Sequence, residues 1–89
     1  MKVMFSSYML SSTKDTSIDL DFSGSFSELI NLLCNIYGPE FESLILTDGK
    51  LSTKAVILIN NTFLNKEDGL DRMLLNTDVI SFVPVVAGG

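Results

Sequence analysis

The sequence has 89 residues, 46% hydrophobic and 19% charged, and its 11 acidic and 6 basic residues give a formal net charge of −5. This length suits one small domain, the hydrophobic content excludes intrinsic disorder, and the acidic balance argues against nucleic acid or an anionic membrane as a partner. With no His, the commonest metal ligand, and one Cys, which cannot form an internal disulfide, the chain is expected in the reducing cytoplasm without a metal site.

Two strands are predicted at the start of the chain. Lys2–Met9 reads as a strand, and Leu10–Asp15, rich in Ser, Thr and Asp, is predicted to be a turn. Thr16–Phe22 then alternates apolar and polar residues, which is typical of a strand with one buried face. The predicted inward residues of the two strands are Val3, Phe5, Ile18, Leu20 and Phe22. We expect the strands to pair as a hairpin.

A capping box marks the start of the main predicted helix. Ser25 and Glu28 have the spacing at which each side chain bonds the backbone amide of the other. Apolar residues then recur at helical intervals and form a stripe that can lie on a sheet. Gly38-Pro39 is expected to end the helix, because Gly accepts a left-handed conformation and Pro cannot continue it. Cys34 lies on the stripe without an evident activating base and is interpreted as a buried structural thiol.

The middle of the chain contains the most apolar run. Phe41–Lys54 is either a short helical turn or an extended connection, with a turn at Asp48-Gly49. Ala55–Asn60 is predicted to be a central strand buried on both faces. After a break at Asn60-Asn61, Thr62–Leu64 is interpreted as a short return strand.

The last third leads from a turn into a final strand. Leu70–Leu75 is too short for a helix to be assigned, and Asn76–Asp78 is predicted to be a turn. Val79–Pro84 should be the last strand and should end at Pro84, which has no amide to donate. We therefore divide the chain into one domain over residues 1–84 and a flexible C-terminal tail over residues 85–89.

This order of elements predicts an α+β domain, a mixed sheet of four to five strands with one main helix on one face. If the first and last strands pair in the middle of the sheet, the fold is a ubiquitin-like β-grasp.

The two final glycines admit two interpretations. They are either small residues at a frayed end or a substrate, because a backbone without Cβ atoms can enter a narrow enzyme channel. The Gly89 carboxylate could then be adenylated and attacked by a sulfur or nitrogen nucleophile. Such a protein needs no catalytic side chains, and the absence of His, metal-ligand spacing and a Gly-rich phosphate loop also disfavours an enzyme.

A frame of turn, apolar strand, proline and glycines runs through the last third of the chain. It consists of Gly69-Leu70-Asp71, Leu74, Asn76-Thr77-Asp78-Val79-Ile80 and Phe82-Val83-Pro84-Val85-Val86-Ala87-Gly88-Gly89. This frame resembles the ubiquitin-like sulfur carriers, which include the molybdopterin synthase small subunit (MoaD), the thiamine sulfur carrier (ThiS) and archaeal small modifier proteins. The strands at Lys2–Phe5 and Ala55–Asn60 are also similar to the MoaD branch.

The chain departs from the MoaD branch at two points. It has Val83-Pro84 where that branch often has two prolines, and Asn76-Thr77-Asp78 replaces the more usual Gly-Asp turn. The ending Val86–Gly89 is also similar to the carriers of thiamine and cysteine synthesis. The pathway therefore stays open between molybdopterin, thiamine and cysteine.

The resemblance implies a carrier that is not itself an enzyme. A ThiF/MoeB-like enzyme would adenylate Gly89 with ATP, and a sulfur donor would convert it to a thiocarboxylate. The sulfur would pass to a MoaE-like large subunit of molybdopterin synthase or to another acceptor enzyme. The carrier would bind no cofactor, and only its partner would consume ATP. The residues expected to bind partners are Phe82, Pro84, Val85, Val86, Ala87 and Gly88.

Other interpretations remain open. The chain could instead be a ubiquitin-like modifier that forms isopeptide bonds with lysines, or an interaction domain with incidental glycines. Phe82 is either a docking residue or part of the core. One set of acidic residues either steers a basic partner or forms a solvated face: Asp19, Asp21, Glu67, Asp68, Asp71 and Asp78.

Overall fold

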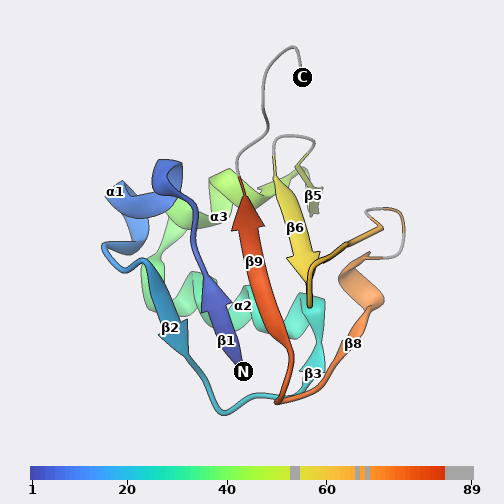
Figure 1. The fold of residues 1–89 in the computed structure, drawn as a ribbon. Helices are drawn as coiled ribbons and strands as arrows, with labels where there is room; N and C mark the ends of the chain where they lie inside the picture. The colour runs from blue at the N-terminus through green and yellow to red at the C-terminus, as the bar shows by residue number, and fades with distance from the viewer. Residues whose placement is uncertain (53–54, 66, 68, 84–89) are drawn as a thin grey trace.

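A mixed five-stranded sheet is the framework of the computed structural model, which describes residues 1–52, 55–65, 67 and 69–83. Its strands, in the spatial order β2-β1-β9-β6-β7, are β1 (Lys2–Met4), β2 (Ser17–Asp19), β6 (Val56–Ile59), β7 (Thr62–Phe63) and β9 (Val79–Val83). The first and last strands are parallel, with Val3 opposite Ile80, and the other neighbours are antiparallel (Figure 1). This pairing confirms the β-grasp prediction, including the opening hairpin of β1 and β2.

The main helix, α2 (Phe26–Tyr37), begins where the capping box predicts. The Ser25 Oγ accepts a hydrogen bond from the Glu28 amide, and the Ser25 amide donates to Glu28 Oε1, both at 3.1 Å. Gly38, at a φ of 94°, ends the helix. The buried stripe of α2 packs against the sheet and consists of Phe26, Leu29, Ile30 and Leu33.

Pro39 begins a second helix rather than only stopping the first. It is the first residue of α3 (Pro39–Ile45), a position where a helix needs no amide donor. The segment after Phe41 is therefore helical, and Phe41 and Ile45 are fully buried.

The chain after β1 differs from the predicted long strand and turn. Residues beyond Phe5 form η1 (Ser7–Met9) and α1 (Leu10–Thr13), which ends at Lys14 with a φ of 59°. Met9 is fully buried, but its side chain enters the core from a helical turn and not from a strand.

Two tight turns confirm the sequence signals. Asp48-Gly49 joins β4 (Leu46–Thr47) to β5 (Lys50–Leu51), and Asn60-Asn61 joins β6 to β7. All four turn residues have positive φ, as hairpin turns of type I′ require. The segment before Asn76, which is too short for the sequence to predict a helix, contains η2 (Gly69–Asp71) and β8 (Met73–Leu74), and β8 pairs with β3 (Gly24–Ser25).

The helices cover only one face of the sheet (Figure 1). In β6, Ile57 and Ile59 are 2% exposed, whereas Val56 and Leu58 are only partly buried. The prediction that this strand is buried on both faces is therefore wrong, and the sheet has an open face formed largely by apolar side chains.

Candidate functional site

The candidate tail follows β9, which lies between β1 and β6. Val83, the last residue of β9, is opposite Val56. The remaining predicted site residues lie outside the described residues: Pro84, Val85, Val86, Ala87, Gly88 and Gly89. Their proposed roles stay predictions, and so does the domain boundary at residue 84.

Phe82 lies on the helical side of β9. Its side chain is 2% exposed, stacks on Phe5 with ring centroids 6.0 Å apart, and meets the edge of Phe41 at 6.1 Å. The structure agrees with the interpretation of Phe82 as part of the core. The expectation that its side chain docks on a partner is corrected, because the alternation of β9 turns it inward.

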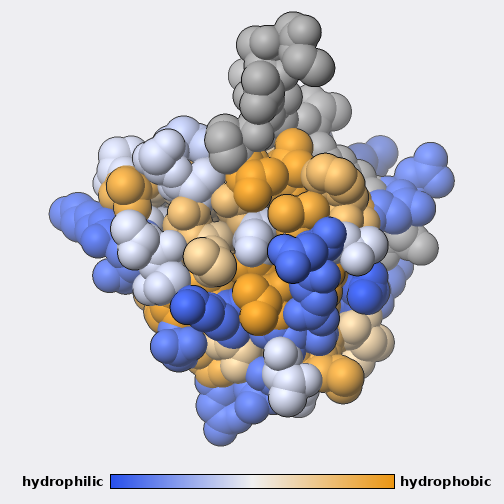
Figure 2. Space-filling model, in the orientation of Figure 1, coloured by the Kyte–Doolittle hydropathy of each residue, from blue (hydrophilic) through white to orange (hydrophobic). Residues whose placement is uncertain are grey.

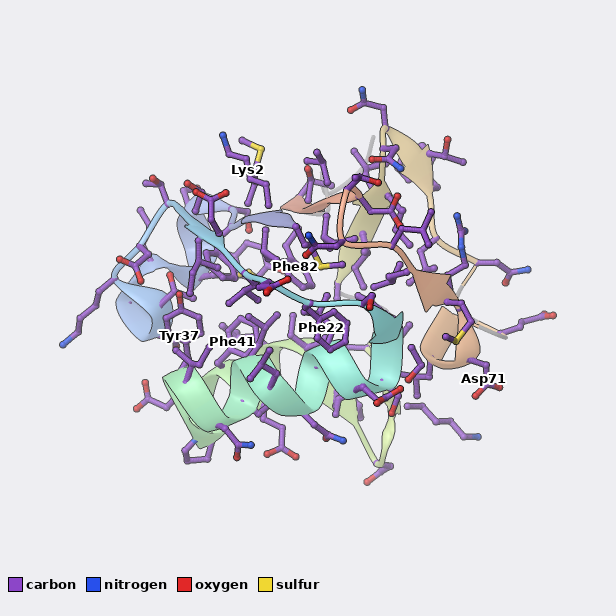
Figure 3. The ribbon with its side chains drawn as sticks, turned by 90° about the horizontal axis from the view of Figure 1, so that it is seen from below. Lys2, Phe22, Tyr37, Phe41, Asp71 and Phe82 are labelled. Carbon is purple, nitrogen blue, oxygen red and sulfur yellow. The ribbon has the colours of Figure 1, made fainter. Side chains whose placement is uncertain are left out.

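An aromatic cluster surrounds Phe82 and joins the end of β9 to α2 and α3. Tyr37 lies 5.3 Å from Phe5 and 5.5 Å from Phe41 between ring centroids, and Figure 3 shows the labelled rings between the sheet and the helices. The Tyr37 hydroxyl donates to Asp15 Oδ2 at 3.0 Å. Desolvation, together with this bond and the charge of Asp15, raises the pKa of Tyr37 to about 12. The end of β9, which precedes the tail, is therefore packed against this aromatic cluster.

The open face of the sheet carries mostly apolar side chains, with Ser81 in the middle of the row across the strands. Pairing places Leu58 opposite both Phe63 and Ser81, and Met4 opposite Ser81. Phe63 is 72% exposed and Met4 43%. We call the outward residues of these strands the open face: Lys2, Met4, Val56, Leu58, Phe63, Val79, Ser81 and Val83. Figure 2 looks onto it and shows apolar side chains over the middle and upper part of the sheet. A large exposed apolar patch is typical of an interaction surface.

At the other end of β9, Asp78 and Asn60 hold the turn that precedes the strand. Asp78 Oδ2 accepts from the Leu75 amide and Oδ1 accepts from Asn60 Nδ2, both at 2.8 Å. Asn60 Oδ1 in turn accepts from the Val79 amide at 2.9 Å. The Leu75 and Asn60 bonds, aided by the charge of Arg72, lower the pKa of Asp78. Asp78 therefore acts as a structural cap, a role missed at the sequence level although Asn-Thr-Asp is a turn signal.

Asn76 joins three segments at the same end of the sheet. Its Oδ1 accepts hydrogen bonds from the Phe22 amide at 2.8 Å and the Met1 nitrogen at 3.3 Å. Four other acidic residues that could steer a partner are exposed: Asp19, Asp21, Glu67 and Asp71. Asp68 lies outside the described residues.

Cys34 is half-buried rather than fully buried. Desolvation, followed by the charge of Glu42, raises its pKa, which favours the unreactive thiol. In the described part of the chain, no three His, Cys, Asp or Glu side chains gather to hold a metal. No helix there is long and apolar enough to cross a membrane.

Comparisons with known proteins identify the family. The ThiS family model matches residues 11–89. The chain is 36% identical over 63 residues to the "Putative sulfur carrier protein" of Archaeoglobus fulgidus, which covers 71% of this chain and 72% of that protein.

Solved structures show the same fold. A chain of the Amycolatopsis orientalis BexX/CysO complex superposes with a TM-score of 0.84 at 18% identity, covering 99% of this chain and 98% of that one. SAMP1 of Methanosarcina acetivorans gives 0.80 at 23%, covering 99% and 94%. Urm1 of Trypanosoma brucei gives 0.74 at 26%, covering 99% and 93%. The family match, the curated relative and the β-grasp fold lead to one conclusion: the chain belongs to the ThiS family of ubiquitin-like sulfur carriers.

Proposed function

We propose that the chain carries sulfur as a thiocarboxylate on Gly89 and donates it in molybdopterin biosynthesis as the small subunit of a molybdopterin synthase. The observation that carries this proposal is the ThiS family match, which extends through Gly89. The MoaD-like strands at Lys2–Phe5 and Ala55–Asn60 favour molybdopterin over the thiamine and cysteine pathways.

The chemistry divides between the carrier and its partners. The Gly89 carboxylate attacks the α-phosphate of ATP on a ThiF/MoeB-like enzyme, and pyrophosphate leaves. A hydrosulfide-level donor then attacks the acyl adenylate, AMP leaves, and the thiocarboxylate forms. A MoaE-like large subunit or another acceptor enzyme receives the sulfur. The carrier is not catalytic in this scheme, binds no cofactor, and works in the reducing cytoplasm.

The carrier supplies binding and positioning. The open face docks on the partner, and the aromatic cluster around Phe82 fixes the end of β9 so that the following residues can be directed into the partner's active site. The BexX/CysO complex supports this arrangement, because a protein of similar fold is there seen together with another protein.

The direct test is intact-protein mass spectrometry after incubation with ATP, a ThiF/MoeB-like enzyme and sulfide. We expect a mass gain equal to replacement of one carboxylate oxygen by sulfur, and no gain in a chain lacking Gly89. Sulfur transfer to the molybdopterin precursor on a MoaE-like subunit would then support the pathway. An activating enzyme that modifies its own carrier but not this chain would contradict the proposal.

A second candidate is a ubiquitin-like protein modifier. It is favoured by the likeness in fold to SAMP1 of Methanosarcina acetivorans, whose full name is small archaeal modifier protein 1. Both functions begin with adenylation, so deletion of Gly89 does not separate them. Lysine-linked conjugates of the chain in cell extract, mapped by peptide mass spectrometry, would favour the modifier, and their absence together with sulfur transfer would favour the carrier.

A further inference from the structure

The two edges of the five-stranded sheet differ in how they are protected. The β2 edge carries Asp19 and is flanked by Asp15 and Asp21, and charges of this kind usually discourage pairing with another strand. The β7 edge consists of Thr62 and Phe63, has no charged residue, and exposes 72% of the Phe63 side chain. The β7 edge is therefore the one open to a further strand.

The register of β6 and β7 fixes where the backbone groups of Phe63 point. The Leu64 amide donates to the Ile57 carbonyl at 2.9 Å, and Leu58 is opposite Phe63. In an antiparallel pair, bonded and non-bonded residues alternate, so the Phe63 N–H and C=O point away from β6. Neither group has a hydrogen-bond partner among the described residues.

A hollow of about 290 Å³ lies beside this edge. It is lined by Phe63, Leu64, Asn65, Asp71 and Arg72. Its η2 wall is close to the sheet because Gly69 packs on Leu64, where an added Cβ would come within 2.9 Å of the leucine Cδ2. The outward backbone of Phe63 is thus next to a space with both polar and apolar walls.

We propose that an extended segment of the adenylating partner adds to β7 as a further strand, an inference that rests on the proposed function. A partner that docks on the open face covers Phe63, and covering its N–H and C=O without hydrogen bonds is unfavourable. An added strand satisfies both groups while it extends the apolar contact.

The alternation of strands specifies this segment. The partner residue opposite Phe63 shares the open face with Phe63 and Leu58, so it should be apolar. Its two neighbours point to the other side of the sheet, where Asp71 and Arg72 line the hollow, so they should be polar. The expected partner segment is an exposed strand with a polar-apolar-polar pattern.

The test compares Phe63→Pro with Phe63→Ala in binding to a ThiF/MoeB-like enzyme, measured by calorimetry. Both variants lose the ring, but only proline loses the outward N–H, and neither breaks a bond to β6. We expect Phe63→Pro to bind about five- to tenfold more weakly than Phe63→Ala. Ser17→Pro is the matched control, because the bond from the Phe5 amide to the Thr16 carbonyl turns the Ser17 N–H outward at the β2 edge. It should bind like wild type.

Hydrogen exchange in the wild-type chain supplies a second readout that needs no variant. The Phe63 amide should exchange more slowly in the complex with the enzyme than in the free chain. Equal affinity of the Phe63 variants, or unchanged exchange at Phe63, would overturn this inference and leave the proposed function standing. Failure of the wild-type chain to bind or to be adenylated would overturn both.

Discussion

Asp78 shows how a single residue at this site can be misread from sequence. Its carboxylate is one of six acidic groups considered for steering a partner, yet both of its oxygens accept hydrogen bonds inside the chain. The Leu75 amide and Asn60 hold it in place, and Asn60 also accepts from the Val79 amide. Asp78 therefore sets the position at which β9 starts, and charge alone did not indicate this role.

Replacement of Asp78 by Asn should destabilise the chain in a pH-dependent way. The amide places an NH2 group where an acceptor is needed, so the free energy of unfolding at pH 7 should fall by about 1 kcal/mol. The folded-state pKa of Asp78 is lowered from 3.8, so its contribution is complete above that pH and is lost as the pH falls through the lower folded value.

Chemical denaturation across this pH range measures the effect. The stabilities of wild type and Asp78→Asn should converge in acid as the native carboxylate is protonated. Asp19→Asn is the control, because Asp19 lies at an exposed site on the β2 edge, and this variant should change stability little. A stability gap for Asp78→Asn that persists unchanged into acid would contradict the role of the charged cap.

At the scale of elements, local signals located some boundaries and failed at others. The Ser25 and Glu28 pair located the start of α2, and Gly38 located its end, because these signals act within one turn of the chain. Pro39 predicts the end of a helix, yet its missing amide donor also suits the first position of a new one, which is where it lies in α3. The apolar run at Ala55–Asn60 correctly predicted a strand but wrongly predicted that both of its faces are buried. Burial of both faces depends on helices elsewhere in the chain.

The end of β9 gives the element-scale prediction. Phe82→Ala removes a fully packed ring beside Phe5 and Phe41, and should lower the free energy of unfolding by about 3–5 kcal/mol. Val83→Ala changes a partly buried neighbour on the open face and should cost much less. Urea denaturation of both variants measures the difference. A loss at Phe82 no larger than at Val83 would show that the aromatic cluster does not anchor the strand.

At the scale of the whole molecule, the candidate site combines a part visible in sequence with a part that is not. The glycine ending and the preceding strand were recognisable because they are contiguous. The open face was not, because Met4, Leu58 and Val79 come from three strands whose register is set by pairing across the length of the chain. The parallel contact of β1 and β9 brings that face and the end of β9 onto one side of the molecule.

This shared placement predicts that the open face governs partner affinity and not the chemistry at Gly89. Met4→Glu puts a charge on the face, where desolvation opposes docking, and should raise the KM for the carrier in adenylation about tenfold with kcat unchanged. Ile36→Glu is a matched control, because Ile36 on α2 is 46% exposed against 43% for Met4 but lies in the helical layer. Steady-state pyrophosphate release with a ThiF/MoeB-like enzyme measures both constants. Equal increases in KM for the two variants would mean that docking depends on overall charge. A decrease in kcat alone for Met4→Glu would mean that Met4 helps to place Gly89 in the active site and does not contribute to docking.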